Sequence, residues 1–241
     1  MKIIIDTTEN VAKRAAQLYV DLLSRNPQAV LGGATGSTPI PLYKELVKLN
    51  KEGVISFKDA KSFNLDEYVG LEGTHDQSYR YFMNDNLFNH IDIKMENTHV
   101  PSGIDISEPE KYDAEIEAAG GIDMQLLGIG VDGHIGFNEP GTPWDSLTHV
   151  VELEQNTREV NARFFNSIDE VPTHAVTMGI KTVMNARSII LIATGSSKAE
   201  IVKKFIEGPV TTEVPASILQ LHPFVTVFLD HEAAALLEKQ A

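Results

Sequence analysis

The densest set of groups able to move protons lies between Gly128 and Pro140, in the run Gly-Ile-Gly-Val-Asp-Gly-His-Ile-Gly-Phe-Asn-Glu-Pro. Asp132, His134 and Glu139 fall within eight residues of it. Histidine exchanges a proton near neutral pH, and a neighbouring carboxylate fixes its tautomer and raises its basicity. A metal site or a surface loop is the alternative, although one histidine and two acids at this spacing match no common metal motif. The pattern therefore favours acid–base catalysis.

A second candidate is the acidic pair in Phe63-Asn64-Leu65-Asp66-Glu67-Tyr68, which ends a short apolar run. Adjacent acids at the end of a strand are most often solvated loop charges or helix caps. A catalytic role for Asp66 is the less common interpretation when this stretch is taken alone.

A glycine-rich run, Gly-Gly-Ala-Thr-Gly-Ser-Thr-Pro, covers residues 32–39. Glycines let an anion approach the backbone closely, and the helix expected after them offers free N–H groups and its positive dipole end. Ser37 and Thr38 add hydroxyl donors. The run matches neither the P-loop nor the dinucleotide-binding pattern, so phosphate binding and a simple tight turn both remain open.

Two basic residues are candidates for holding an anion. Lys198 closes Thr-Gly-Ser-Ser-Lys at a strand-to-helix junction, where a positive charge is unfavourable for the helix dipole unless an anion is bound. Arg163 lies between apolar residues and could clamp a phosphate with two hydrogen bonds. A solvated lysine and an ordinary exposed helical arginine are the alternatives.

The elements that must position these residues alternate between strand and helix. Apolar runs predict strands at residues 3–5, 29–31, 62–65, 122–129, 188–194 and 224–229, and helical periodicity predicts helices at 9–25, 39–51, 78–90, 197–207 and 232–239. This order is typical of an α/β fold, Rossmann-like, with a mainly parallel sheet flanked by helices. Ligands bind at the carboxyl ends of such strands, so we expect the four loops to meet in one pocket.

No stretch with the composition of a linker divides the chain, so we expect a single catalytic domain over residues 1–241. Apolar periodicity is least regular from residue 141 to residue 172, which includes the only tryptophan, Trp144. We interpret residues 141–172 as a lid inserted over the sheet.

Charge and composition exclude several classes of partner. The chain of 241 residues carries 34 acidic and 20 basic side chains, a formal net charge of −14. This balance argues against nucleic acid and against an anionic membrane surface, but not against a small anionic ligand in a locally positive pocket. The absence of cysteine excludes disulfides, thiolate catalysis and zinc–thiolate sites. With no signal peptide and no membrane-spanning run evident, we expect a cytoplasmic protein.

Taken together, the motifs resemble those of the glucosamine-6-phosphate deaminase family, which is related to ribose-5-phosphate isomerases and phosphogluconolactonases. The resemblance covers nearly the whole chain in the same order. Its matching stretches are residues 35–39, 63–71, 132–140, 156–165, 195–198 and 219–223. The Asn-Leu-Asp-Glu-Tyr and Asp-Gly-His-Ile-Gly-Phe-Asn-Glu-Pro runs are specific to deaminases, whereas the glycine loop and the lysine are shared more widely.

The resemblance implies conversion of D-glucosamine 6-phosphate and water to D-fructose 6-phosphate and ammonia, with no metal or organic cofactor. It implies that His134, tuned by Asp132 and Glu139, opens the sugar ring and that Asp66 removes the C2 proton. It assigns the phosphate to six residues: Thr35, Gly36, Ser37, Thr38, Arg163 and Lys198.

The sequence departs from longer, allosteric members, which carry basic residues soon after the Asn-Glu-Pro run. Here no lysine or arginine occurs between Glu139 and Arg158, and the chain ends soon after Asp230. We therefore expect a monomer or small homo-oligomer with simple saturation kinetics. A 6-phosphogluconolactonase and a non-catalytic sugar-phosphate sensor are the competing interpretations. The deaminase-specific runs count against the first, and the acidic chain without a DNA-binding segment counts against the second.

Overall fold

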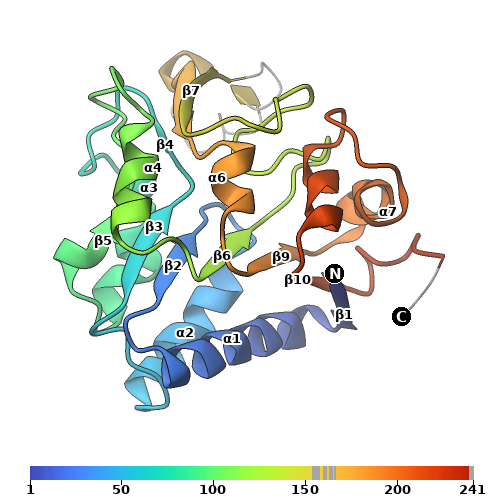
Figure 1. The fold of residues 1–241 in the computed structure, drawn as a ribbon, viewed down its shortest axis with the longest axis horizontal. Helices are drawn as coiled ribbons and strands as arrows, with labels where there is room; N and C mark the ends of the chain where they lie inside the picture. The colour runs from blue at the N-terminus through green and yellow to red at the C-terminus, as the bar shows by residue number, and fades with distance from the viewer. Residues whose placement is uncertain (154–157, 160–161, 163–164, 166, 239–241) are drawn as a thin grey trace.

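A seven-stranded parallel sheet forms the centre of the molecule, with strand order β1-β10-β9-β6-β2-β3-β5 (Figure 1). The computed structural model describes residues 1–153, 158–159, 162, 165 and 167–238. The strands of this sheet are β1 (Lys2–Asp6), β2 (Val30–Gly33), β3 (Lys61–Asn64), β5 (Thr98–His99), β6 (Met124–Leu127), β9 (Ile189–Ala193) and β10 (Val225–Asp230). Every residue of β9 is buried, as expected for a central parallel strand covered on both faces.

Helices cover both faces of the sheet. On one face lie α1 and α2, with α3 beside α2, and on the other lie α4, α6 and α7 (Figure 1). Their bounds are α1 (Thr8–Arg25), α2 (Ile40–Lys51), α3 (Tyr79–Asn86), α4 (Lys111–Ala118), α6 (Ile180–Met184) and α7 (Ala199–Glu207). Short 3₁₀ turns are η1 (Phe88–His90), η2 (Met95–Asn97), η4 (Ile168–Glu170), η5 (Ser196–Lys198) and η6 (Pro215–Leu221). The predicted α/β fold with a mainly parallel sheet is thus confirmed.

Helix α1 illustrates how the sequence pattern produces an element. The Thr7 side chain accepts a hydrogen bond from the Asn10 N–H and caps the first turn. Apolar residues then recur on the face that packs on the sheet, and the buried ones include Val11, Ala15 and Tyr19.

Among the described residues, no helix is both long and apolar enough to span a bilayer.

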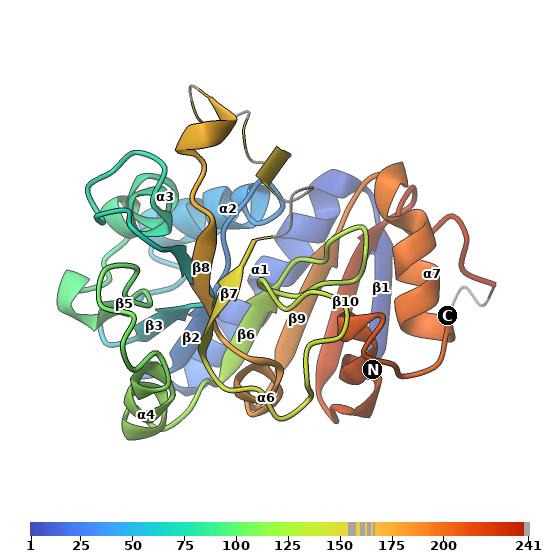
Figure 2. The ribbon, with the colours of Figure 1, turned by 90° about the horizontal axis from the view of Figure 1, so that it is seen from above.

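A second, antiparallel sheet has the order β4-β8-β7 and consists of β4 (Asp66–Tyr68), β8 (His174–Thr177) and β7 (His149–Glu152). Figure 2 shows β7 and β8 side by side. The chain passes from the large sheet to the small one through one residue, Leu65. Its N–H donates to the Gly33 carbonyl (3.1 Å) and its carbonyl accepts from the Met178 N–H (2.7 Å). The start of β4, and with it Asp66, is therefore held by backbone bonds on both sides.

Two predicted helices differ from the structure. The helix expected at residues 232–239 is wrong, because residues 231–236 form turns. The helix expected at residues 78–90 stops at Asn86, since Leu87 leaves helical geometry (φ −140°, ψ −63°), and a 3₁₀ turn follows. Within the segment interpreted as a lid, residues 149–152 form β7. Its role as a lid and the single-domain boundary stay predictions.

Close packing of Gly103 against β4 yields a stability prediction. A Cβ atom at this position would lie 2.0 Å from the Tyr68 carbonyl oxygen and 3.3 Å from Glu67 Cγ. Because both neighbours belong to the short strand, we expect Gly103→Ala to lower the free energy of unfolding by about 1–3 kcal/mol, measured by urea denaturation. Gly128→Ala is the control, since its Cβ would meet no atom within 4 Å. Equal stability of the two variants would contradict the prediction.

Candidate active site

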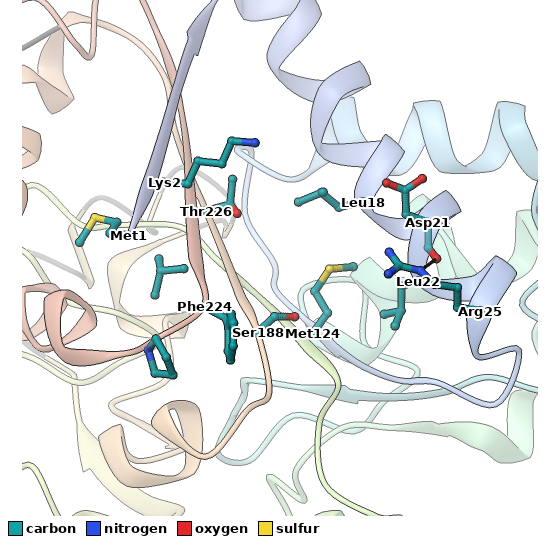
Figure 3. Close-up of a pocket in the computed structure, with 12 residues that line it drawn as sticks. Met1, Lys2, Leu18, Asp21, Leu22, Arg25, Met124, Ser188, Phe224 and Thr226 are labelled. Carbon is teal, nitrogen blue, oxygen red and sulfur yellow. Dashed lines mark hydrogen bonds between the residues drawn. The ribbon is translucent and has the colours of Figure 1, made fainter. Parts of the chain in front are cut away.

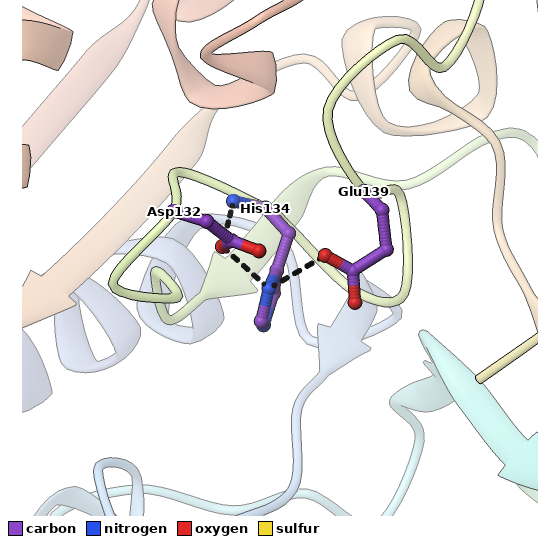
Figure 4. A group of neighbouring side chains, drawn as sticks. All are labelled: Asp132, His134 and Glu139. Atoms are coloured by element: carbon purple, nitrogen blue, oxygen red, sulfur yellow. Dashed lines mark hydrogen bonds and ion pairs between the residues drawn. The ribbon is translucent and has the colours of Figure 1, made fainter. Parts of the chain in front are cut away.

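The histidine loop, residues 128–140, follows β6 and brings Asp132, His134 and Glu139 together (Figure 4). His134 Nδ1 lies 2.8 Å from Asp132 Oδ1 and 3.3 Å from Glu139 Oε2. The His134 N–H also donates to Asp132 Oδ1 (3.1 Å). A Cβ on Gly130 would lie 2.2 Å from His134 Cε1, so only glycine there leaves room for the ring. Both carboxylates face Nδ1, which leaves Nε2 as the nitrogen able to exchange a proton with a ligand.

The carboxylates set the charge of the ring. Burial disfavours the imidazolium, but the contacts with Asp132 and Glu139 outweigh it and raise the pKa of His134 to about 9. Burial likewise disfavours ionised Asp132, yet its contacts with His134 and Glu139 hold its pKa below the ordinary value. At neutral pH the ring is therefore a cation held by an anion, a state from which it can donate a proton.

The same three side chains offer ligand atoms within 4.8 Å of one another and could in principle hold a metal ion. The shortest contact argues against this. Two ligands of a tetrahedral zinc lie roughly 3.4 Å apart at the usual bond lengths, whereas His134 Nδ1 and Asp132 Oδ1 are separated by 2.8 Å. That distance fits the contact of an imidazolium with a carboxylate.

Asp66 is the third carboxylic acid of the site. It is 6% exposed and pairs with Thr177 across the β4–β8 ladder. Its carboxylate faces the histidine loop, because Asp66 Oδ2 would lie 3.7 Å from a Cβ placed on Gly136. Burial, followed by the negative charge of Glu67, raises the pKa of Asp66 to about 7, and the charge of His134 opposes the rise. A carboxylate with such a pKa is well matched to general-base work near neutral pH.

Side chains from two other strand ends line one cavity of about 360 Å³. Ser37 and Thr38 come from the glycine-rich loop after β2, and Ser197 and Lys198 from the loop after β9. Helix α2 begins without a side-chain cap. Pro39 and Pro41 have no N–H group, and the Ile40 N–H donates to the Ser37 carbonyl (3.3 Å), so the start of the helix favours an anion through its positive dipole end. Thr35 and Gly36 precede the two lining hydroxyls in the same loop, and Gly36 adopts φ +92°.

Lys198 connects this cavity to the histidine loop. Its Nζ donates to the Ile129 carbonyl (2.7 Å), and burial lowers its pKa while the charge of Asp132 opposes that effect. The neighbouring N–H groups are already bonded: Gly195 donates to Asp230 (2.9 and 3.0 Å) and Ser196 to Glu232 (3.2 Å). An anion in the cavity could therefore bind the Lys198 ammonium and the Ser197 hydroxyl of this loop, but not the N–H groups of Gly195 and Ser196. The predicted Arg163 lies outside the described residues.

A larger hollow of about 620 Å³ lies at the opposite, amino-terminal edge of the sheet (Figure 3). Lys2, Leu22, Met124 and Phe224 are among the residues that line it. None of the predicted site residues that the structure describes line it, and strand topology places ligands at the other edge.

The structure adds residues that the sequence patterns did not single out. Thr177 Oγ1 accepts from the Phe137 N–H (3.1 Å), and Asn138 Nδ2 donates to the Ile135 and Met178 carbonyls (2.9 and 2.8 Å). Both side chains are fully buried and fasten the histidine loop to the strand that pairs with β4. No motif in the neighbouring sequence identifies Thr177, because its role depends on its position opposite Asp66 in the β4–β8 pair.

The chain is similar to known proteins over nearly its whole length. The family model described as glucosamine-6-phosphate isomerases/6-phosphogluconolactonase matches residues 5–227. The chain is 52% identical over 241 residues to a glucosamine-6-phosphate deaminase of Thermoanaerobacter pseudethanolicus, covering 98% of this chain and 95% of that protein. It is 54% identical over 231 residues to one of Lachnoclostridium phytofermentans, covering 94% and 98%.

Solved structures give the same result. A monomeric glucosamine-6-phosphate deaminase superposes with a TM-score of 0.94 at 45% identity, covering 98% of this chain and all of the other. A 6-phosphogluconolactonase from Thermotoga maritima, at 20% identity and a TM-score of 0.75, shares the fold. On this evidence the chain belongs to the family of glucosamine-6-phosphate isomerases and 6-phosphogluconolactonases.

Proposed function

We propose that this protein is a glucosamine-6-phosphate deaminase, which converts D-glucosamine 6-phosphate and water to D-fructose 6-phosphate and ammonia. The observation that carries the proposal is the approach of buried Asp66 to the loop of His134, which gives one site a base and an acid with pKa values of about 7 and 9. Relatives more than half identical over nearly the whole chain carry that name. The cytoplasmic location expected from the sequence stays a prediction.

The phosphate of the substrate would lie in the cavity at the ends of β2 and β9. Ser37, Thr38 and Lys198 line it, Thr35 and Gly36 shape the loop, and the start of α2 adds its positive dipole end. Arg163 remains a candidate from the sequence. The sugar would then extend toward the histidine loop, because Lys198 also contacts the Ile129 carbonyl.

Ring opening breaks the bond between C1 and the ring oxygen. One proton must reach the ring oxygen and one must leave the O1 hydroxyl. We assign both transfers to His134, which is charged at neutral pH and can donate first. Asp132 and Glu139 contact the Nδ1 side of the imidazole. Because His134 gives one proton and takes one back, its imidazole has the same charge before and after the step.

The open-chain aldehyde carries an acidic proton at C2. Asp66 removes it. The C2–H electron pair forms the C1=C2 bond of an enolamine, while the C1=O π pair moves to O1, which takes a proton and becomes a hydroxyl. Asp66 then returns its proton to C1 as the nitrogen lone pair forms the C2=N bond, and the nitrogen gives up one proton, which balances the one that O1 gained. Water hydrolyses the resulting ketimine at C2 to the ketone and ammonia. This sequence consumes one water and leaves Asp66 ionised again.

The direct test is to incubate the protein with glucosamine 6-phosphate and measure both products. We expect ammonia and fructose 6-phosphate in equal amounts, and no hydrolysis of 6-phosphogluconolactone. Asp66→Asn should lower kcat by about 10²–10⁴-fold and abolish exchange of the C2 proton with solvent, with substrate binding by calorimetry little changed. Failure of the wild-type protein to form either product at millimolar substrate would disprove the function, and wild-type exchange in the variant would remove Asp66 from the base role.

The pH dependence of kcat/KM tests the acid–base pair. Activity should rise near pH 7 as Asp66 ionises and fall near pH 9 as His134 loses its proton. Asp132→Asn removes a negative charge that raises the pKa of His134, so the alkaline limb should move to lower pH. The ionisations of the substrate are the same for both proteins, so the difference between the two profiles reports on the enzyme. An unmoved alkaline limb would exclude His134 as its source.

We expect a monomer with hyperbolic kinetics, in line with the monomeric relative at 45% identity. Initial rates against glucosamine 6-phosphate should be hyperbolic and unaffected by N-acetylglucosamine 6-phosphate, and light scattering should give the mass of one chain, 26.5 kDa. Sigmoidal kinetics that the acetylated sugar abolishes would overturn this expectation.

A further inference from the structure

Glu67, the neighbour of Asp66 on β4, is 3% exposed and its carboxylate is bonded to the backbone of three residues. Its Oε1 accepts from the N–H groups of Tyr68 and Tyr79 (both 2.8 Å), and its Oε2 accepts from that of Arg80 (3.0 Å). Tyr79 and Arg80 begin α3, so these are N–H groups that the helix cannot use itself, at its positive dipole end. Glu67 thus joins β4 to α3.

This junction bears directly on the position of Asp66. Strand β4 has three residues and, within the described part of the chain, pairs with β8 alone, so few ladder hydrogen bonds hold it. Successive side chains of a strand point to opposite faces, which directs Asp66 toward the histidine loop when Glu67 is fixed against α3. Gly103 packs on the Glu67 side, leaving the strand little room to shift.

The negative charge of Glu67 lacks a direct counter-ion among the described residues. Arg80 is the neighbouring cation, but its guanidinium donates to Thr98 Oγ1 (2.7 Å) and the Thr98 carbonyl (2.8 Å) and lies 5.9 Å from the Phe88 ring centre. Burial raises the pKa of Glu67, and the three backbone donors, followed by the charge of Arg80, oppose that rise. These donors stabilise the carboxylate without cancelling its formal charge.

We propose that Glu67 is a positioning residue for the Asp66 base: it ties β4 to α3 and places a fixed, buried negative charge beside the group that removes the substrate proton. This inference rests on the proposed deaminase function. A misplacement of one ångström can cost about 10²-fold in rate, so the three-bond anchor on such a short strand is a strong determinant of activity.

The groups that face Asp66 single out Glu67 as its negative neighbour. Tyr43 on α2, Tyr79 on α3 and Tyr112 on α4 interact with Asp66, and burial raises the pKa of each, so all three are neutral at pH 7. The histidine loop contributes the positive His134, which lowers the pKa of Asp66, while Glu67 raises it. A like charge next to a base makes the base stronger.

The test compares kcat, KM and the pH profile of Glu67→Gln with those of the full wild-type chain. We expect kcat to fall about 10-fold or more, KM to change little, and the acid limb of kcat/KM to move down by at least about 0.5 pH unit. Glu67→Asp keeps the charge but shortens the anchor, so its kcat should fall while its acid limb stays in place. This second variant also serves if the glutamine variant does not fold.

Asp92→Asn is the matched control. Asp92 also accepts from a backbone N–H, that of Phe57 (2.7 Å), and from the side chains of Asn50 and Ser56, at the C-terminal end of α2. It should lose stability on heating but keep the wild-type acid limb. If Glu67→Gln leaves the acid limb unmoved and lowers the rate equally at every pH, or if Glu67→Asp has wild-type kcat, the positioning role is wrong.

A readout without turnover separates this inference from the proposed function. Carbon-13 NMR titration of the Asp66 carboxyl in substrate-free protein should give a lower pKa in Glu67→Gln than in the wild type. An inactive wild-type protein with this shift would disprove the deaminase function alone. If the pKa of Asp66 is the same in the two proteins, the role of Glu67 is wrong, whichever reaction the protein catalyses.

Discussion

The two backbone hydrogen bonds of Leu65 are the constraint on which the rest of the site depends. Its N–H donates to the Gly33 carbonyl in β2, and its carbonyl accepts from the N–H of Met178, just after β8. Leu65 is the single residue between the end of β3 in the large sheet and the start of β4 in the small one. A buried chain must pair its polar groups, and this path pairs both backbone groups of Leu65. Asp66 is thereby placed where β8, the histidine loop and the glycine-rich loop converge.

Burial then divides the acidic residues into different chemical roles. Asp66, enclosed and beside another anion, has a raised pKa, whereas Asp132, half-exposed and in contact with an imidazolium, has a lowered one. Environments that separate the pKa values of neighbouring groups in this way are how one site provides both a base and an acid near neutral pH. The large negative charge of the whole chain is compatible with a phosphate ligand because Lys198 and the start of α2 make the cavity end locally favourable.

Much of the fold follows from patterns within single segments. Apolar runs located β1, β2, β3, β6, β9 and β10 to within two residues at their starts, since a parallel strand buried on both faces is apolar throughout. Strand β5 and the small sheet escaped prediction, because β4, β7 and β8 are short and partly polar. The apolar pattern from residue 232 onward falls on turns at residues 231–236, in which Ala233 and Ala234 are buried, instead of on a helix. A segment of two to four residues is too short for a hydrophobic period that distinguishes a strand from a loop.

The sequence by itself determined which chemistry is available: the histidine with its two acids lies within one loop, and local spacing was enough to bring those groups into contact. Only the tertiary structure decided that Asp66 faces that loop, that Thr177 and Asn138 fasten it, and that Glu67 anchors the strand. These contacts join segments 12 to about 110 residues apart, and they depend on strand register and on burial, which raises the pKa of a carboxyl only after the chain has closed around it.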